Sequence, residues 1–294
     1  MAAVVRKRIS EADAIIRPPA AFGRAKALSG VRVYDVGQGD AIAVLDQGGV
    51  PVLQIDYGGR QGSPFRKKKP SDVDVSMPVA SDTCVMLTHW DEDHWSSAPK
   101  GDAARKAEWL VPRQVTSPRA VRFSAGLARA ACVPETRVGR TYAFRAANGD
   151  TLLFQKIRHS AVSPAQDEDC NRSGVALALV RGVGSDGQVI LLPGDASFGW
   201  VPLYRRLHAS GRSLTGLVAF HHGAGTHWTR STRALLRDWR HTSGSDCQVM
   251  FSCSSDNGYG HPQPDLYSEL MNISGCTTFS LRAAGRKSAD ILFR

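Results

Sequence analysis

Leu87-Thr88-His89-Trp90-Asp91-Glu92-Asp93-His94 directly follows an apolar run, Cys84 to Leu87, that is typical of a buried strand. Four potential metal ligands, His89, Asp91, Asp93 and His94, lie within six residues. A strand that ends in a tight turn brings such side chains together at one rim of a sheet. The spacing lets one short loop supply ligands to a pair of neighbouring metal ions. The alternative is a solvated acidic turn that carries two chance histidines.

Two later apolar runs also end in side chains that can bind metal. The run Gln188–Leu192 leads to Asp195, and the run Leu217–Phe220 leads to His221 and His222. Each observation alone is weak, because an Asp after Pro-Gly is usually a turn residue and a lone His is usually structural. Together with the first loop, they predict a metal site at one edge of paired sheets.

The other segments predict the surrounding elements. Val31–Asp35, Ala41–Leu45 and Val50–Ile55 are strand-like and are separated by glycine-containing turns, so they predict a β-meander. Asp56 ends the last of these strands and is placed to orient a neighbouring loop, with capping of its own turn as the alternative. Residues 117–131 predict an amphipathic helix.

Composition limits the class of protein. The chain has 294 residues, 42% of them hydrophobic and 22% charged, which is enough for a substantial core. We predict an N-terminal arm over residues 1–28 and a single domain over residues 29–294. The net charge of +10 favours a polyanionic partner such as nucleic acid, with a generally basic background as the alternative. The sequence shows no signal peptide and no apolar run of membrane-spanning length, so we expect no membrane partner and a cytoplasmic location.

Short motifs that extend through most of the chain carry a resemblance to a known family. They are Asp35-Val-Gly-Gln-Gly-Asp-Ala41, Asp56-Tyr-Gly-Gly59, Thr88-His-Trp-Asp-Glu-Asp-His94, Asn171-Arg-Ser-Gly-Val175, Gly194-Asp195-Ala196, His221-His-Gly-Ala224 and Asn257-Gly-Tyr-Gly-His-Pro262. With these motifs the chain resembles metallo-β-lactamase-fold proteins, and it is similar to the soluble hydrolase domain of the ComEC-type competence proteins. The resemblance implies an α/β (α+β) fold. This is an αββα sandwich of two mixed β-sheets with helices outside and a two-metal site at the sheet edges.

The same resemblance implies a role for each ligand. Asp195 would bridge two divalent ions, Zn²⁺ or Mn²⁺. His89 and Asp91 would hold one ion, with Asn171 in support. The superfamily usually has a His where this chain has Asp91, whereas the competence-type proteins also have an Asp there. A carboxylate-rich ligand set makes Mn²⁺ a competitor to Zn²⁺.

The second ion would be held by Asp93, His94 and one histidine of the pair His221 and His222. We favour His221, as the first residue past the strand, and His222 is the alternative. A further departure from the family is Ala224, which stands where a serine is expected.

These features predict a metal-dependent phosphodiesterase, specifically a nuclease that uses metal-activated hydroxide. The candidate catalytic residues are Asp93 and His261. The role that we assign to His261 is leaving-group acid or phosphate clamp, with a structural turn histidine as the alternative. Two other functions fit the same motifs, because a fold does not choose a reaction. One is a hydrolase of lactone, thioester or β-lactam substrates, and the other is a non-catalytic module that binds metal or nucleic acid.

Overall fold

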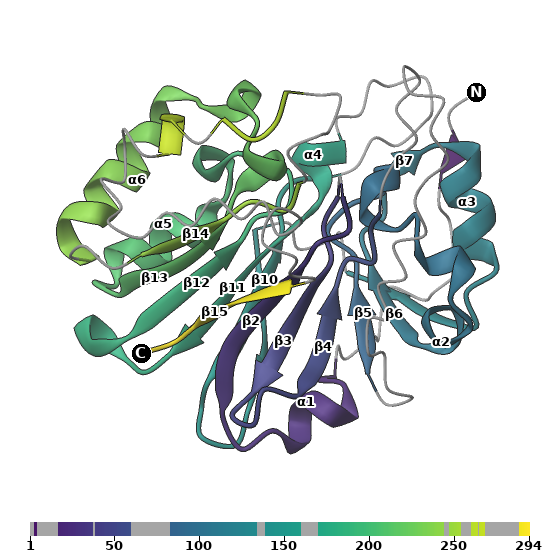
Figure 1. Cartoon of the computed structure of the whole chain (residues 1–294), viewed down its shortest axis with the longest axis horizontal. Coiled ribbons are helices and arrows are strands. Elements are labelled where there is room, and N and C mark those ends of the chain that lie inside the picture. The colour runs from purple at the N-terminus through teal and green to yellow at the C-terminus, as the bar shows by residue number, and fades with distance from the viewer. Residues whose placement is uncertain are drawn as a thin grey trace.

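Two β-sheets face each other in a computed structural model of the chain, and helices cover their outer sides (Figure 1). The structure describes residues 3–4, 17–37, 39–59, 83–133, 139–159, 170–243, 247–253, 260–263, 265–267 and 288–294. Residues 257–259, which begin the last of the family motifs, lie outside the described residues.

The first sheet has seven strands in the order β15-β2-β3-β4-β5-β6-β8. Their bounds are Leu28–Tyr34 (β2), Ile42–Asp46 (β3), Pro51–Ile55 (β4), Cys84–Met86 (β5), Glu108–Val111 (β6), Arg129–Cys132 (β8) and Ser288–Leu292 (β15). Strands β2, β3 and β4 are antiparallel neighbours, so the predicted β-meander is confirmed. Strands β4, β5, β6 and β8 run parallel, which makes the sheet mixed.

The second sheet has six strands in the order β14-β13-β12-β11-β10-β9. Their bounds are Thr141–Arg145 (β9), Thr151–Lys156 (β10), Val175–Arg181 (β11), Gln188–Leu192 (β12), Ser213–Val218 (β13) and Gln248–Met250 (β14). Strands β9 to β12 are antiparallel, whereas β12, β13 and β14 are parallel. This sheet is therefore mixed as well.

Six α-helices and a short strand pair are also among the described elements. The helices are Ala20–Arg24 (α1), Asp102–Lys106 (α2), Pro118–Ala125 (α3), Cys170–Ser173 (α4), Pro202–Ala209 (α5) and Arg230–Ser243 (α6). The strand pair joins Ala3–Val4 (β1) to Val115–Thr116 (β7). None of the helices in this described part is long and apolar enough to cross a membrane.

Alternating side chains of the central strands enter two different cores. On β11, Leu177 lies in the core between the sheets, whereas Ala178 lies in the core that Leu203 of α5 and Leu236 of α6 share. A third core lies under α2 and α3 on the outer face of the first sheet. Because successive residues of a strand point to opposite faces, this pattern places a sheet between each pair of cores. The predicted αββα sandwich of two mixed β-sheets with helices outside is confirmed.

The helix predicted over residues 117–131 is shorter than expected. Helix α3 ends at Ala125, and Arg129–Cys132 forms β8 on the open edge of β6. Backbone pairing with β6 satisfies the polar groups of this segment, and such tertiary pairing overrides a moderate helix propensity. In the predicted arm, Phe22 of α1 is fully buried in the core between the sheets. The arm and domain division at residue 28 stays a prediction.

Candidate metal centre

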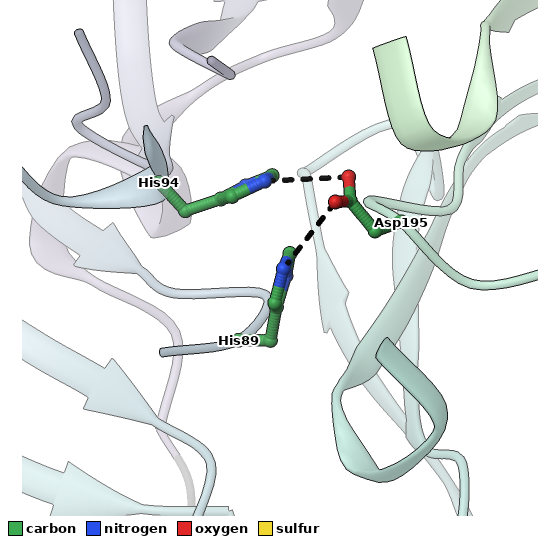
Figure 2. A group of neighbouring side chains, drawn as sticks. All are labelled: His89, His94 and Asp195. Carbon is green, nitrogen blue, oxygen red and sulfur yellow. Dashed lines mark ion pairs between the residues drawn. The ribbon is translucent and has the colours of Figure 1, made fainter. Parts of the chain in front are cut away.

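The candidate ligands lie where strands of both sheets end. Strand β5 of the first sheet leads into the loop that carries His89 and His94, and β12 of the second sheet leads to Asp195. Strand β13 leads to His221 and His222. Figure 2 shows His89 and His94 pointing from one side toward Asp195 on the other. The ends of strands from both sheets therefore meet at this place.

Asp195 occupies the centre of the group. Its Oδ2 lies 3.6 Å from Nε2 of His89, and its Oδ1 lies 3.3 Å from Nε2 of His94 (Figure 2). Nε2 of His222 lies 3.6 Å from the same Oδ1. The two carboxylate oxygens thus face different histidines, which is the arrangement that a bridging carboxylate needs. The side chain is only 4% exposed, so its charge has little water to stabilise it.

Two further carboxylates divide the group into two overlapping sets. Asp91 lies with His89, at 3.4 Å between Oδ2 and Nε2. Asp93 lies with His222, at 3.1 Å between Oδ2 and Nε2, and its Oδ1 lies 3.9 Å from Nε2 of His94. This division follows the two ligand sets that the resemblance implied, with Asp195 common to both.

The geometry favours His222 rather than His221 as the partner of Asp93. His222 is 1% exposed and close to Asp93, whereas His221 is 26% exposed and lies 3.7 Å from Asp195. Both histidines have left-handed backbone conformations, with φ of 48° for His221 and 53° for His222. Non-glycine residues rarely adopt this region, and such strain is concentrated at functional sites. The strained turn directs the second histidine inward, which a reading of the sequence order could not show.

Asp56 anchors His94 from behind. Its Oδ2 lies 2.8 Å from Nδ1 of His94, and it accepts hydrogen bonds from the backbone N–H and the hydroxyl of Thr88 at 2.7 Å and 2.6 Å. A carboxylate at Nδ1 fixes the proton there and leaves Nε2 as the atom that faces the cluster. Burial raises the pKa of the Asp56 carboxyl, while His94 and Thr88 act against this shift. The structure thus places Asp56 behind the candidate ligand His94, and its supporting role stays a prediction.

Asp40 provides a second anchor of the same kind, and the sequence analysis assigned it no role. Its Oδ1 lies 3.4 Å from Nδ1 of His222, and the hydroxyl of Ser252 lies 3.1 Å from the same nitrogen. Asp40 is 2% exposed. The sequence signal that could have pointed to Asp40 is its position in the first family motif, directly after Gly39. Its pairing with His222 was not visible there, because the two residues are far apart in the sequence.

Two glycines let the backbone close around Asp93. A Cβ atom on Gly39 would lie 2.1 Å from the carbonyl oxygen of Asp93, and one on Gly58 would lie 1.9 Å from it. Neither distance is compatible with a side chain. Gly39 also has a φ of 129°, which favours glycine. The Gly-x-Gly-Asp and Tyr-Gly-Gly motifs therefore hold the loop that carries Asp93 in place.

The buried atoms of this cluster fit a divalent metal. Nε2 of His89, His94 and His222 and Oδ1 of Asp195 are buried, and none of them has a hydrogen-bond partner among the described residues. Imidazole nitrogens and carboxylate oxygens that converge without partners are a typical set of metal ligands. The ligand atoms of His89, His94 and Asp195 lie within 4.8 Å of one another, and so do those of Asp93, His94 and His222.

The electrostatics show how strongly the cluster favours positive charge. Burial lowers the pKa of His89, but Asp195 and Asp91 outweigh burial and raise it to about 9. Burial likewise acts against a raised pKa at His222, where Asp195, Asp40 and Asp93 prevail. The carboxylates thus create a site for cations, and bound metal ions would replace the protons.

Two predicted residues lie at the margin of the cluster. Asn171 is half-buried in α4, and a Cβ atom on Gly174, just after α4, would lie 3.2 Å from the Cβ of His89. His261 is half-buried, with its ring centroid 5.8 Å from that of His221. Burial lowers the pKa of His261 to about 4, with contributions from His222 and His221. The roles of Asn171 and His261 stay predictions.

Asp40→Asn is expected to weaken metal binding about 10- to 100-fold, because an amide orients the imidazole of His222 less strongly than a carboxylate does. The measurement is the dissociation constant for Zn²⁺, obtained by competition with a chromophoric chelator. Asp46→Asn, at the end of β3 where the carboxylate accepts a hydrogen bond from the backbone of Gly48, is the matched control and should leave the dissociation constant unchanged. Equal constants for Asp40→Asn and the unsubstituted protein would show that Asp40 does not position His222.

Comparisons with known proteins give matches among solved structures alone. A scan against models of protein families and a search of characterised protein sequences find no match. The metallo-beta-lactamase fold protein YhfI from Bacillus subtilis is 11% identical, with a TM-score of 0.46 and coverage of 90% of this chain and 98% of that chain.

Two enzymes are also similar. A B3 metallo-beta-lactamase with an active site glutamic acid is 11% identical, with a TM-score of 0.36 and coverage of 79% of this chain and 96% of that chain. The metallo-beta-lactamase MIM-1 from Novosphingobium pentaromativorans is 11% identical, with a TM-score of 0.32 and coverage of 90% of this chain and 89% of that chain. The structural neighbours are therefore metallo-β-lactamase-fold proteins, and the fold class of this chain rests on the sheets and cores described above.

Proposed function

We propose that the protein is a metal-dependent hydrolase that cleaves phosphodiesters, with nucleic acid as its substrate class. The observation that carries this proposal is the convergence of three buried histidine Nε2 atoms on Asp195, flanked by Asp91 and Asp93. A buried cluster of this kind, without hydrogen-bond partners for its nitrogens, has a clear chemical use as a metal centre.

The ligand sets assign the residues that would hold two ions. His89, Asp91 and Asp195 would hold one ion, and Asp195 would share its carboxylate with the set of Asp93, His94 and His222. Such a pair of ions stabilises the charge that develops on a transferring phosphoryl group and lowers the pKa of bound water. Three of the ligands are carboxylates, and these favour hard ions such as Mn²⁺ more than a histidine-rich set does.

The exposed side of the cluster is where a substrate would enter. Among the candidate ligands Asp91 is 46% exposed and Asp93 is 15% exposed, whereas the histidine ligands and Asp195 are almost fully buried, and the neighbouring His221 is 26% exposed. His261 lies beside His221 at this opening, where its imidazole can hold a phosphoryl oxygen by a hydrogen bond. The net charge of +10 and the resemblance to competence-type hydrolases both support a nucleic-acid substrate over a small uncharged one.

Metal-free protein reconstituted with Mn²⁺ or Zn²⁺ is expected to hydrolyse bis(p-nitrophenyl) phosphate and to cleave end-labelled single-stranded DNA. The expected rate is at least about 100-fold above that of the metal-free protein, because the ions supply most of the charge stabilisation. The release of p-nitrophenol and the appearance of shortened DNA are the two readouts. Metal-loaded protein that opens a β-lactam or a lactone but leaves both phosphodiesters intact would contradict the proposal.

A further inference from the structure

We propose that the exposed face of α6 binds the phosphodiester backbone of a nucleic acid and guides it to the metal centre. This inference rests on the proposed phosphodiesterase function, since it names the surface that would hold the polymeric substrate. The surface, called here the α6 arginine face, consists of Arg230, Arg233 and Arg237.

The three arginines form one continuous row. They lie three and four residues apart on a helix, so they share one face of α6, and all three are exposed. Together with Trp228 and Ala234 they line an open groove of about 460 Å³. The groove therefore has a cationic wall and one aromatic side chain, Trp228, which precedes α6 in the sequence.

The guanidinium groups of this row are not engaged by other described residues. In the part of the chain that the structure describes, none of the three side chains forms a hydrogen bond or an ion pair, and the backbone N–H of Arg233 donates to the carbonyl of Thr229. By contrast, Arg32 pairs with Asp290, and Arg119 pairs with Glu92. Three adjacent unpaired guanidiniums repel one another and are complementary to an anion that spans the whole row.

The dimensions of the row fit a phosphodiester backbone. Seven residues of α-helix rise about 10 Å, which is the distance along the axis from Arg230 to Arg237. One strand of B-form DNA carries a phosphate about every 3.4 Å along its axis, so the row spans about three phosphates. A single small anion would neutralise one guanidinium and leave the others unpaired.

Ring contacts connect the segment just before α6 to the metal centre. His227 lies three residues before the start of α6, and its ring stacks on that of His221 with 4.8 Å between ring centroids. His221 is in turn 3.7 Å from Asp195. On the other side, the ring of Trp200 lies 5.3 Å from that of His227 and carries the guanidinium of Arg172 at 4.2 Å. A nucleic-acid backbone that runs from α6 past His227 would thus meet the further positive charge of Arg172.

The test uses metal-free protein, so that binding is measured without cleavage. The variant combines Arg230→Gln, Arg233→Gln and Arg237→Gln. The probe is a fluorescein-labelled single-stranded DNA of about 30 nucleotides. Its binding is measured by fluorescence anisotropy at salt concentrations from about 50 to 300 mM. We expect the affinity at low salt to fall by about tenfold or more. The plot of log K against log salt should become less steep by about 2, because each phosphate contact on a single strand contributes about 0.7.

A matched control removes the same charge from the far side of the molecule. It combines substitutions to Gln at Arg105 of α2, Arg122 of α3 and Arg129 of β8, and α2 and α3 lie on the opposite side of Figure 1 from α6. The control should keep the affinity and salt dependence of the unsubstituted protein to within about twofold. Equal losses in both variants would overturn the proposal, since net charge alone would then explain the binding.

Hydrolysis of bis(p-nitrophenyl) phosphate separates this inference from the proposed function. The metal-loaded α6 variant should hydrolyse this small substrate at the unsubstituted rate while cleaving DNA more slowly. If the small diester is hydrolysed but DNA does not bind, the α6 proposal fails and the phosphodiesterase proposal stands. A protein that binds anionic phospholipid vesicles through the α6 arginine face, and no nucleic acid, would also overturn it.

Discussion

Asp195→Asn is expected to lower kcat/KM for bis(p-nitrophenyl) phosphate by at least about 1000-fold, which corresponds to about 4 kcal/mol of lost transition-state stabilisation. The asparagine has nearly the same shape, so it keeps the packing of a side chain that is 4% exposed. It removes the negative charge that faces His89 on one oxygen and His94 on the other. An uncharged amide cannot bridge two cations, and the loss should therefore appear both in activity and in bound metal.

The measurement combines metal analysis of the dialysed protein with steady-state kinetics. Asp150→Asn is a suitable control because Asp150 is also buried, at 2% exposed, but accepts a hydrogen bond from the backbone of Leu28 away from the cluster. The control should keep its metal and its kcat. If Asp195→Asn retained full metal content and activity within about tenfold of the unsubstituted protein, the metal centre would have to be assigned to other residues.

The ligand loop and the strand ends could be predicted because their signals are local. An apolar run of four or more residues indicates a buried strand, and a ligand-type residue just after it lies at a sheet edge whatever the rest of the fold. The spacing of His89, Asp91, Asp93 and His94 is visible in the sequence itself. For this reason both sheets and the meeting of three strand ends agree with the structure.

The anchors of the ligands could not be predicted in the same way, because they depend on contacts between distant segments. Asp40 and His222 are 182 positions apart and follow strands of different sheets, and only the packing of the two sheets on each other brings them to 3.4 Å. The choice between His221 and His222 depends on a left-handed turn, which no residue preference at two consecutive histidines would indicate. Strand β8 was missed for a related reason, since its pairing partner β6 lies outside the local window.

Asp56→Ala is expected to lower the free energy of unfolding by about 3–5 kcal/mol, because it breaks a buried charged pair and leaves its partners without an acceptor. Three groups lose their acceptor: Nδ1 of His94, and the backbone N–H and hydroxyl of Thr88. Asp56 is fully buried, so water cannot take its place without opening the loop. Urea denaturation of the metal-free protein measures the loss as a lower midpoint at an unchanged slope.

A stability loss alone would not distinguish an anchor of the metal centre from any other buried carboxylate, so metal affinity is the second readout. Without Asp56, Nδ1 of His94 has no acceptor to fix the orientation of the imidazole ring, and the affinity for Zn²⁺ should therefore fall about 10- to 100-fold. Asp150→Ala also removes a buried acceptor and should destabilise the protein, but its Zn²⁺ affinity should not change, because Asp150 contacts Leu28 and Arg181 instead of a ligand. If both variants bound Zn²⁺ equally well, Asp56 would support the fold and not the metal centre. The left-handed backbone at Asp56, with φ of 54°, argues for the metal centre, because strain at a buried non-glycine residue persists where the position of its side chain matters.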